Sequence, residues 1–275
     1  MTDLNATAEE RYTPGYGDDL VRSYEARTVG REAAFFAPRL RPGMSLLDVG
    51  CGPGTITVGL ARLVAPGRVC GIDIEESQVD RARRRAQSLS VTNVSFARHS
   101  AYEIPFPDGS FDAVFAHALL QHLRDPLAAL REFHRLLKPG GVIGVRDDDQ
   151  GSLLIAPASP QMVRVIAVLK TGLQRHGFDP DVGRRHRQLL RAGGFLTTEA
   201  SASVEYDGTA ETTRKRGQLA AKLLKDMASL IVAGGTATHD EVAQLAVSAE
   251  QWGADPDAFD AITWCEATGV KEHAR

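Results

Sequence analysis

The sequence has 275 residues, of which 43% are hydrophobic and 24% are charged, and its formal net charge is −3 at neutral pH. These values are typical of one large globular domain with additions, and they give no reason to expect a nucleic-acid or membrane partner. The cysteines, Cys51, Cys70 and Cys265, lack metal-ligand spacing, so we expect a cytoplasmic protein without structural zinc. No apolar run reaches about eighteen residues, so we expect no membrane span.

Residues 1–43 precede the first predicted strand and contain one predicted helix, at 18–40. Tyr12, Tyr16 and Tyr24 lie in this segment, where they could cover a ligand or simply pack against the domain. We therefore predict an N-terminal helical lid segment over residues 1–43.

From residue 44 onward, strand-like apolar runs alternate with amphipathic helix-like segments. The predicted strands are 44–50, 69–74, 94–98, 111–116 and 140–147, and the helices between them are 56–65, 77–89 and 125–138. Such alternation is typical of a parallel α/β sheet with helices on its faces.

The second half of the sequence continues the pattern and adds helical segments. A helix at 184–195 precedes a strand at 197–206, and helices at 214–234 and 239–252 precede a last strand at 258–269, expected to be antiparallel at or near the sheet edge. We predict a doubly wound, Rossmann-like, mostly parallel seven-stranded sheet within one domain, 44–275. Helical insertions near 148–180 and 207–255 are candidates for a lid, because insertions at strand ends often select the substrate.

The segment LLDVGCGPGT (46–55) runs from a strand through a glycine-rich turn into a helix. Gly50, Gly52 and Gly54 allow a tight turn and a close ligand approach, but they do not complete the GxGxxG pattern of dinucleotide sites. The carboxylate of Asp48 would repel a diphosphate and attract the ammonium and sulfonium groups of S-adenosylmethionine. Asp73 follows at the spacing of an acid that binds ribose hydroxyls, and Ile74 could pack on adenine.

Three segments together resemble the class I S-adenosylmethionine-dependent methyltransferases, in the small-molecule subgroup similar to the ubiquinone and menaquinone biosynthesis enzymes. They are LLDVGCGPG, GIDI and IPFPDGSFDAVFAHALLQHLRDPLAALREFHRLLKPGG, within residues 44–147. The resemblance implies S-adenosylmethionine as the cofactor. It also implies that the turn approaches the methionyl and ribose parts, that Asp73 binds ribose, and that Arg27 reaches the cofactor carboxylate. Ser100 stands where the family has an aspartate, so the contact to the adenine amino group is expected to be weaker or to come from elsewhere, while Ala101 can still offer its backbone N–H.

His117, just past the fourth predicted strand, matches a position that commonly lines the methyl-donor pocket in this family, and it is the first choice for a general base. The predicted cofactor-binding residues are Tyr16, Arg27, Asp48, Gly50, Cys51, Gly52, Gly54, Asp73, Ile74, Gln78, Ser100, Ala101 and His117. His117 and His122 are five residues apart, which does not suit a helical metal site, so no metal is predicted. The acids at 147–149 are expected to be a solvated loop, although they could also attract a substrate amine or hold a divalent cation.

The resemblance and the low charge together favour an enzyme that moves a methyl group by in-line displacement to a small, partly apolar acceptor, such as a secondary metabolite or quinone precursor. Two alternatives remain open at this point: a nicotinamide-dependent oxidoreductase on the same fold, and a non-catalytic S-adenosylmethionine-binding module, for which Ser100 is the only hint. We expect neither a nucleic-acid nor a membrane partner, and a homodimer is possible.

Overall fold

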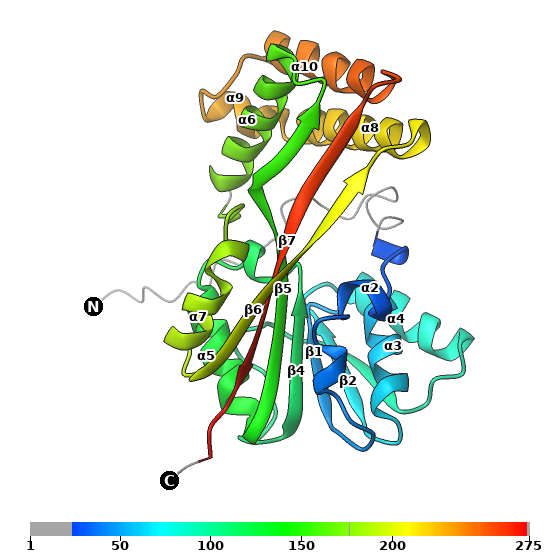
Figure 1. The fold of residues 1–275 in the computed structure, drawn as a ribbon, viewed down its shortest axis with the longest axis vertical. Helices are drawn as coiled ribbons and strands as arrows, with labels where there is room; N and C mark the ends of the chain where they lie inside the picture. Colours follow the sequence, from blue (N-terminus) through cyan, green and yellow to red (C-terminus); the bar gives the residue numbers. More distant parts are fainter. Residues whose placement is uncertain (1–23, 176, 274–275) are drawn as a thin grey trace.

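The computed structural model describes residues 24–175 and 177–273, and a seven-stranded sheet forms its centre (Figure 1). The strands are β1 (Leu46–Val49), β2 (Val69–Asp73), β3 (Val94–Arg98), β4 (Phe111–His117), β5 (Leu137–Ala156), β6 (Thr197–Asp207) and β7 (Phe259–Val270). Their order is β3-β2-β1-β4-β5-β7-β6, with the first five parallel and β7 antiparallel to both β5 and β6. The predicted fold class is confirmed.

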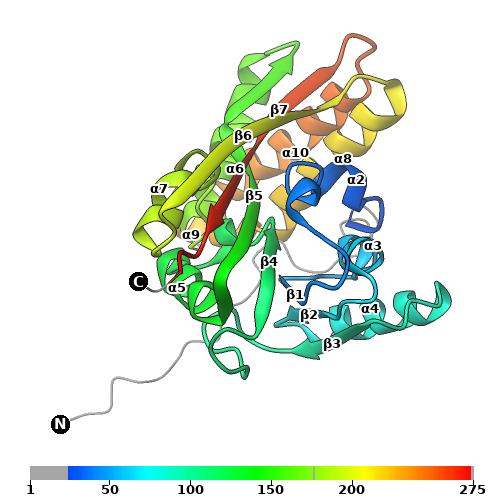
Figure 2. The same ribbon diagram turned by 60° about the horizontal axis from the view of Figure 1, so that its bottom comes forward.

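Helices cover both faces of the parallel part of the sheet (Figure 2). One face carries α2 (Val29–Glu32), α3 (Thr55–Val64) and α4 (Glu76–Ser88), and the other carries α5 (Pro126–Leu136) and α7 (His186–Ala192). Neighbouring residues of β1 alternate between these layers: Leu46 packs with the α3 side and Leu47 with the α5 side. All four residues of β1 are buried, as expected for a central parallel strand.

Strands β5, β7 and β6 extend well beyond the parallel core and carry a second group of helices at their far ends (Figure 1). These are α6 (Pro160–Arg175), α8 (Ala210–Asp226), α9 (Ala228–Ala233) and α10 (His239–Gly253), which we call the cap. The cap has its own apolar cluster, which includes Val165, Leu224 and Trp252. The indole of Trp252 donates to the carbonyl of Ala156 at 3.0 Å and so ties α10 to the end of β5.

Strand β5 is longer than the sequence analysis predicted. Residues 148–156, which we expected to begin the first insertion, continue this strand and pair with β7 on either side of an irregularity between Asp149 and Leu154. Asp147, Asp148 and Asp149 are therefore buried, with 0%, 7% and 5% exposure, and the expectation of a solvated loop is wrong. Pairing with β7 fixes their backbone, and Arg184 neutralises Asp149 at 2.7 Å.

Strand β7 lies between β5 and the edge strand β6, so it is antiparallel and near the sheet edge, as predicted. One other prediction needs correction. The single helix predicted at 18–40 is interrupted in its described part, because Thr28 is extended, and only α2 and a 3₁₀ turn at Ala37–Arg39 follow it. Tyr12 and Tyr16 lie outside the described residues. Among the described helices, none has the length and apolar character needed to cross a bilayer.

Candidate active site

The glycine turn after β1 adopts a conformation that favours glycine. Gly50, Gly52 and Gly54 have φ angles of +73°, +52° and +76°. A Cβ atom on Gly52 would meet no atom within 4 Å, whereas one on Gly54 would lie 2.7 Å from the side chain of Ala82. Gly52 thus leaves open space at the surface of the turn, and Gly54 allows α3 to pack closely on α4.

Asp73 ends β2 beside this turn. Its carboxylate accepts the backbone N–H of Gly52 at 2.9 Å and that of Glu75 at 3.0 Å. Burial raises the pKa of Asp73, while the backbone donors oppose that shift. A carboxylate has about four lone-pair positions, so two remain for hydroxyl donors. Nearby, Gln78 is 1% exposed and its Oε1 has no hydrogen-bond partner within the described part of the chain.

Asp48 lies in β1, just before the glycine turn, and its side chain is buried, with 3% exposure. Its carboxylate accepts the hydroxyl of Thr57 at 2.6 Å. Burial raises the pKa of Asp48 to about 7, the Thr57 hydrogen bond lowers it, and the nearby charge of Asp73 raises it again. The group is therefore poised between its neutral and charged forms, and a cation in the adjoining cavity would favour the charged form.

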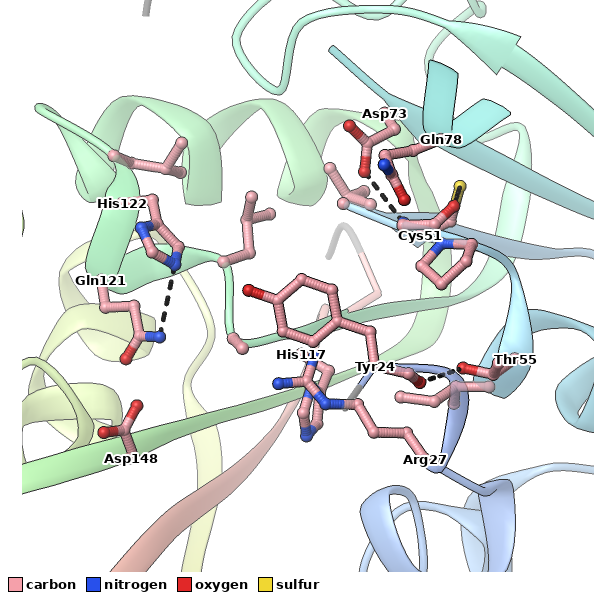
Figure 3. Close-up of a pocket in the computed structure, with 18 of the residues that line it drawn as sticks. Tyr24, Arg27, Cys51, Thr55, Asp73, Gln78, His117, Gln121, His122 and Asp148 are labelled. Atoms are coloured by element: carbon pink, nitrogen blue, oxygen red, sulfur yellow. Dashed lines mark hydrogen bonds between the residues drawn. The ribbon is translucent and has the colours of Figure 1, made fainter. Parts of the chain in front are cut away.

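A cavity of about 330 Å³ opens at the carboxyl ends of β1, β2 and β4 and extends under the cap (Figure 3). Most of the predicted site residues line it: Arg27, Asp48, Gly50, Cys51, Gly52, Asp73, Ile74, Gln78, Ala101 and His117. Gly54 and Ser100 do not line it, and Tyr16 lies outside the described residues. The Ser100 hydroxyl instead accepts the backbone N–H of Tyr102 at 3.3 Å, which holds the turn after β3.

His117 is buried at the end of β4, and its ring stacks on Trp264 with 5.0 Å between ring centroids. Its Nε2 lies 2.8 Å from Nη1 of Arg146. Because a guanidinium only donates, Nε2 must carry the lone pair and Nδ1 the proton. Burial lowers the pKa of His117 well below its usual value, and the charges of Arg27 and Arg146 lower it further.

This arrangement argues against His117 as the general base. Its basic nitrogen is already occupied by Arg146, and a pKa this low makes the ring a poor proton acceptor. The Nδ1 atom has no partner among the described residues, so the ring offers a hydrogen-bond donor instead. Arg146 is itself held by Glu266 at 3.3 Å and Glu205 at 3.1 Å, which fixes its orientation.

Arg27 reaches the cavity from the segment before α2. Its guanidinium lies 4.4 Å from the ring centroid of Tyr24 and 6.0 Å from that of Trp264. Within the described residues it makes no ion pair, so its charge is available to an anionic group such as a carboxylate. Figure 3 shows Arg27 and Tyr24 on the same side of the cavity, next to His117.

The cap and the extended strands build the second half of the cavity. The sequence analysis named insertions near 148–180 and 207–255 as candidates for a lid and considered the acids at 147–149, but it did not identify the other individual residues of this half. Its residues are Leu173 from α6, Phe178 from the following loop, Arg216, Leu219 and Leu223 from α8, Asp148 and Gln150 from β5, Glu205 from β6, and Ile262 and Trp264 from β7. The alternation of Ile262, Trp264 and Glu266 in β7 was a usable signal, because residues two apart in a strand share one face. Nothing in the sequence placed that face over the glycine turn.

The residues present fit S-adenosylmethionine. Gly52 leaves space beside the turn, Asp73 retains hydrogen-bonding capacity, and Gln78 has an unpartnered oxygen. The carboxylate of Asp48 can pair with the ammonium group of a methionyl moiety, and the guanidinium of Arg27 can pair with its carboxylate. Within residues 24–175 and 177–273, no group of three or more histidine, cysteine or acidic residues is arranged to hold a metal ion. Fold and site therefore define a doubly wound α/β protein with a cofactor cavity at the carboxyl ends of its strands.

Comparison with known proteins narrows this class. Residues 40–171 match a family described as a methyltransferase domain. A protein of Aspergillus luteorubrus named "Probable methyltransferase ltbC" is 30% identical, over 94% of this chain and 97% of its own length. Demethylmenaquinone methyltransferase of Staphylococcus aureus (strain JH9) is 36% identical, over 48% of this chain and 54% of its own length. The crystal structure of YcgJ from Bacillus subtilis has a TM-score of 0.59 at 20% identity, covering 88% of this chain and 99% of that one, and shares the fold.

The chain belongs to the class I S-adenosylmethionine-dependent methyltransferases, and it is an enzyme that uses S-adenosylmethionine as its cofactor. This assignment decides against the nicotinamide alternative.

Proposed function

We propose that the methyl acceptor is a small, partly apolar organic molecule, such as a secondary metabolite or quinone precursor, bound between the glycine turn and the cap. The observation that carries this proposal is the far wall of the cavity, where Leu173, Leu223 and Ile262 come from three separate elements. Cavities lined mainly by apolar side chains with a few polar groups are typical of small-molecule sites. A nucleic acid would instead require an open, basic track, whereas Asp148 and Glu205 place acids on this wall.

In this proposal four residues contact different parts of the cofactor. Asp73 accepts the ribose hydroxyls, Ile74 packs against the adenine, Arg27 pairs with the carboxylate, and Asp48 faces the cationic end. When bound, S-adenosylmethionine supplies a methyl group on a sulfonium sulfur, which is a good leaving group. Because the pKa of Asp48 is about 7, a bound cation holds this carboxyl group in its anionic form at neutral pH, and the anion in turn attracts the cationic end of the cofactor.

The protein contributes chiefly by positioning. In-line displacement needs the acceptor atom, the methyl carbon and the sulfur in one line, and holding reactants in such geometry is worth up to about 7 to 11 kcal/mol. The Nδ1 proton of His117 donates into the site, and Arg146 keeps the ring in that tautomer by donating to Nε2 at 2.8 Å. The cap excludes water from the reacting groups by covering the cavity with Leu219 and Leu223.

Incubation with methyl-labelled S-adenosylmethionine and a panel of aromatic and quinone-type small molecules tests this function. We expect label transfer to at least one small molecule, with no transfer to tRNA, DNA or bulk protein. Calorimetry with tRNA and DNA at physiological salt provides the second measurement. Tight nucleic-acid binding, or label found only in a macromolecule, would overturn the proposal. The cytoplasmic location and a homodimer stay predictions from the sequence.

A further inference from the structure

Two hydrogen-bond acceptors occupy the side of the cavity away from the glycine turn. Asp148 lies on β5 and is 7% exposed, and Gln121 lies in the 3₁₀ turn Leu120–His122 and is 6% exposed. Both line the cavity. In Figure 3 the carboxylate of Asp148 and the amide of Gln121 point toward one another, across the cavity from Asp73 and Cys51.

Gln121 is held rigidly and still has an unused acceptor. Its backbone N–H donates to Oδ1 of Asp147 at 3.3 Å, and its backbone carbonyl oxygen accepts the backbone N–H of Asp179 at 2.7 Å. Its side-chain nitrogen lies 3.4 Å from Nε2 of His122. The side-chain oxygen, Oε1, is buried and has no hydrogen-bond partner within the described residues. A buried acceptor without a partner is costly, so this oxygen points to a ligand that donates to it.

Asp148 is fixed as firmly, because β5 pairs it with Trp264 of β7. One carboxylate oxygen accepts the side-chain amide of Gln150. The other oxygen has no side-chain donor among the described residues. Burial raises the pKa of Asp148, and the neighbouring charge of Asp147 raises it further, as expected for an acceptor that lacks full compensation.

The surroundings of this pair indicate the kind of donor. Leu173 and Phe178 line the cavity beside it and suit an apolar body. Arg27 and Arg216 line the same cavity; Asp260 compensates Arg216 at 2.7 Å, whereas the positive charge of Arg27 has no ion pair within the described residues and disfavours an ammonium group. A neutral hydroxyl carries one proton, which a bifurcated hydrogen bond shares between the two acceptors without adding a cation.

We propose that Asp148 and Gln121 form an anchor that binds a hydroxyl group of the methyl acceptor and selects hydroxylated, otherwise apolar molecules. This inference rests on the proposed function, since it assumes a small acceptor in the cap half of the cavity. The pair determines specificity by sharing the one hydroxyl proton between Oδ of Asp148 and Oε1 of Gln121, and neither residue belongs to the glycine turn proposed to hold the cofactor.

The test uses the full chain saturated with S-adenosylhomocysteine. Calorimetry measures the dissociation constants of phenol, 1-naphthol and 2-naphthol and of their methyl ethers, which keep the ring and lose the donor. For wild type we expect the best-bound hydroxyl compound to bind at least about tenfold more tightly than its ether, since a buried acceptor is otherwise left unpaired. In Asp148→Asn and Gln121→Leu, we expect this ratio to fall to about threefold or less.

Asp149→Asn is the matched control, because it makes the same chemical change one residue along β5, where the side chain pairs with Arg184. We expect it to retain the wild-type ratio. Affinity for S-adenosylhomocysteine should stay within about twofold of wild type in all three variants, which shows that the fold and the cofactor site are intact.

The anchor is refuted if wild type binds each ether as well as its hydroxyl compound, or binds none of the six compounds. It is also refuted if Asp148→Asn and Gln121→Leu keep the wild-type ratio. These results are distinguishable from failure of the proposed function, which would appear as methyl transfer to macromolecules only, whatever the binding ratios.

Discussion

Replacing Asp73 by alanine tests the cofactor site at the residue that connects β2 to the glycine turn. Two of the roughly four lone-pair positions of its carboxylate are used by the N–H groups of Gly52 and Glu75, at 2.9 and 3.0 Å. The other two are available to ribose hydroxyls. Hydrogen bonds to a charged group contribute about 1.5 to 3 kcal/mol each, so losing two costs at least about 3 kcal/mol. That corresponds to a dissociation constant roughly 100-fold higher or more.

Isothermal titration with S-adenosylhomocysteine measures this change without turnover. Asp73→Asn keeps one acceptor oxygen and should lose less affinity than Asp73→Ala. Asp80→Ala serves as a control, because Asp80 is exposed on α4 and pairs with Arg83 at the surface. Thermal melts identify variants that have lost the fold. A folded Asp73→Ala protein whose affinity lies within about threefold of wild type would refute the assignment of Asp73 to the cofactor.

Three further predictions concern other parts of the site. The native pKa of Asp48 is about 7 against an ordinary 3.8, so the folded state holds this proton more tightly than the unfolded state. Stability should therefore fall as pH rises from about 4 to 7, by up to about 4 kcal/mol, and urea melts of Asp48→Asn should lack most of this slope. Arg146→Met should destabilise the fold by about 3 to 5 kcal/mol, because it leaves the buried carboxylate of Glu266 without its ion-pair partner, and should raise the pKa of His117 in an NMR titration. The main effect of Gly52→Ala should be weaker binding of S-adenosylhomocysteine, whereas the main effect of Gly54→Ala should be a lower melting temperature.

Each of these has a clear contrary result. Parallel pH–stability curves for wild type and Asp48→Asn would show that this carboxyl titrates normally. An unchanged His117 titration in Arg146→Met would show that the guanidinium does not control the ring. Equal effects of the two glycine substitutions on binding would remove the distinction between ligand space at Gly52 and packing at Gly54.

The parallel core and its cofactor half were predictable from sequence because their signals are local. The apolar run of β1, the turn at Gly50 to Gly54 and the acid at Asp73 lie within about thirty residues, and backbone geometry alone brings them to one sheet edge. The same locality limited the predictions. Gly54 carries the glycine pattern but packs on Ala82, a contact that no pattern within the turn reveals.

The acceptor half depends on tertiary structure. Asp148, Trp264 and Gln121 are separated by many residues, and they meet because β7 inserts antiparallel beside β5 while the cap folds over both. The run at 147–149 illustrates the reason: its acids are typical of a loop, yet strand pairing and Arg184 bury them. The protonation state of His117 has the same origin, since it is set by Arg146 on a neighbouring strand. Sequence determined which groups are present and the local turns at the cofactor side of the cavity, whereas long-range strand pairing and burial decided which groups line the opposite side and in what charge state.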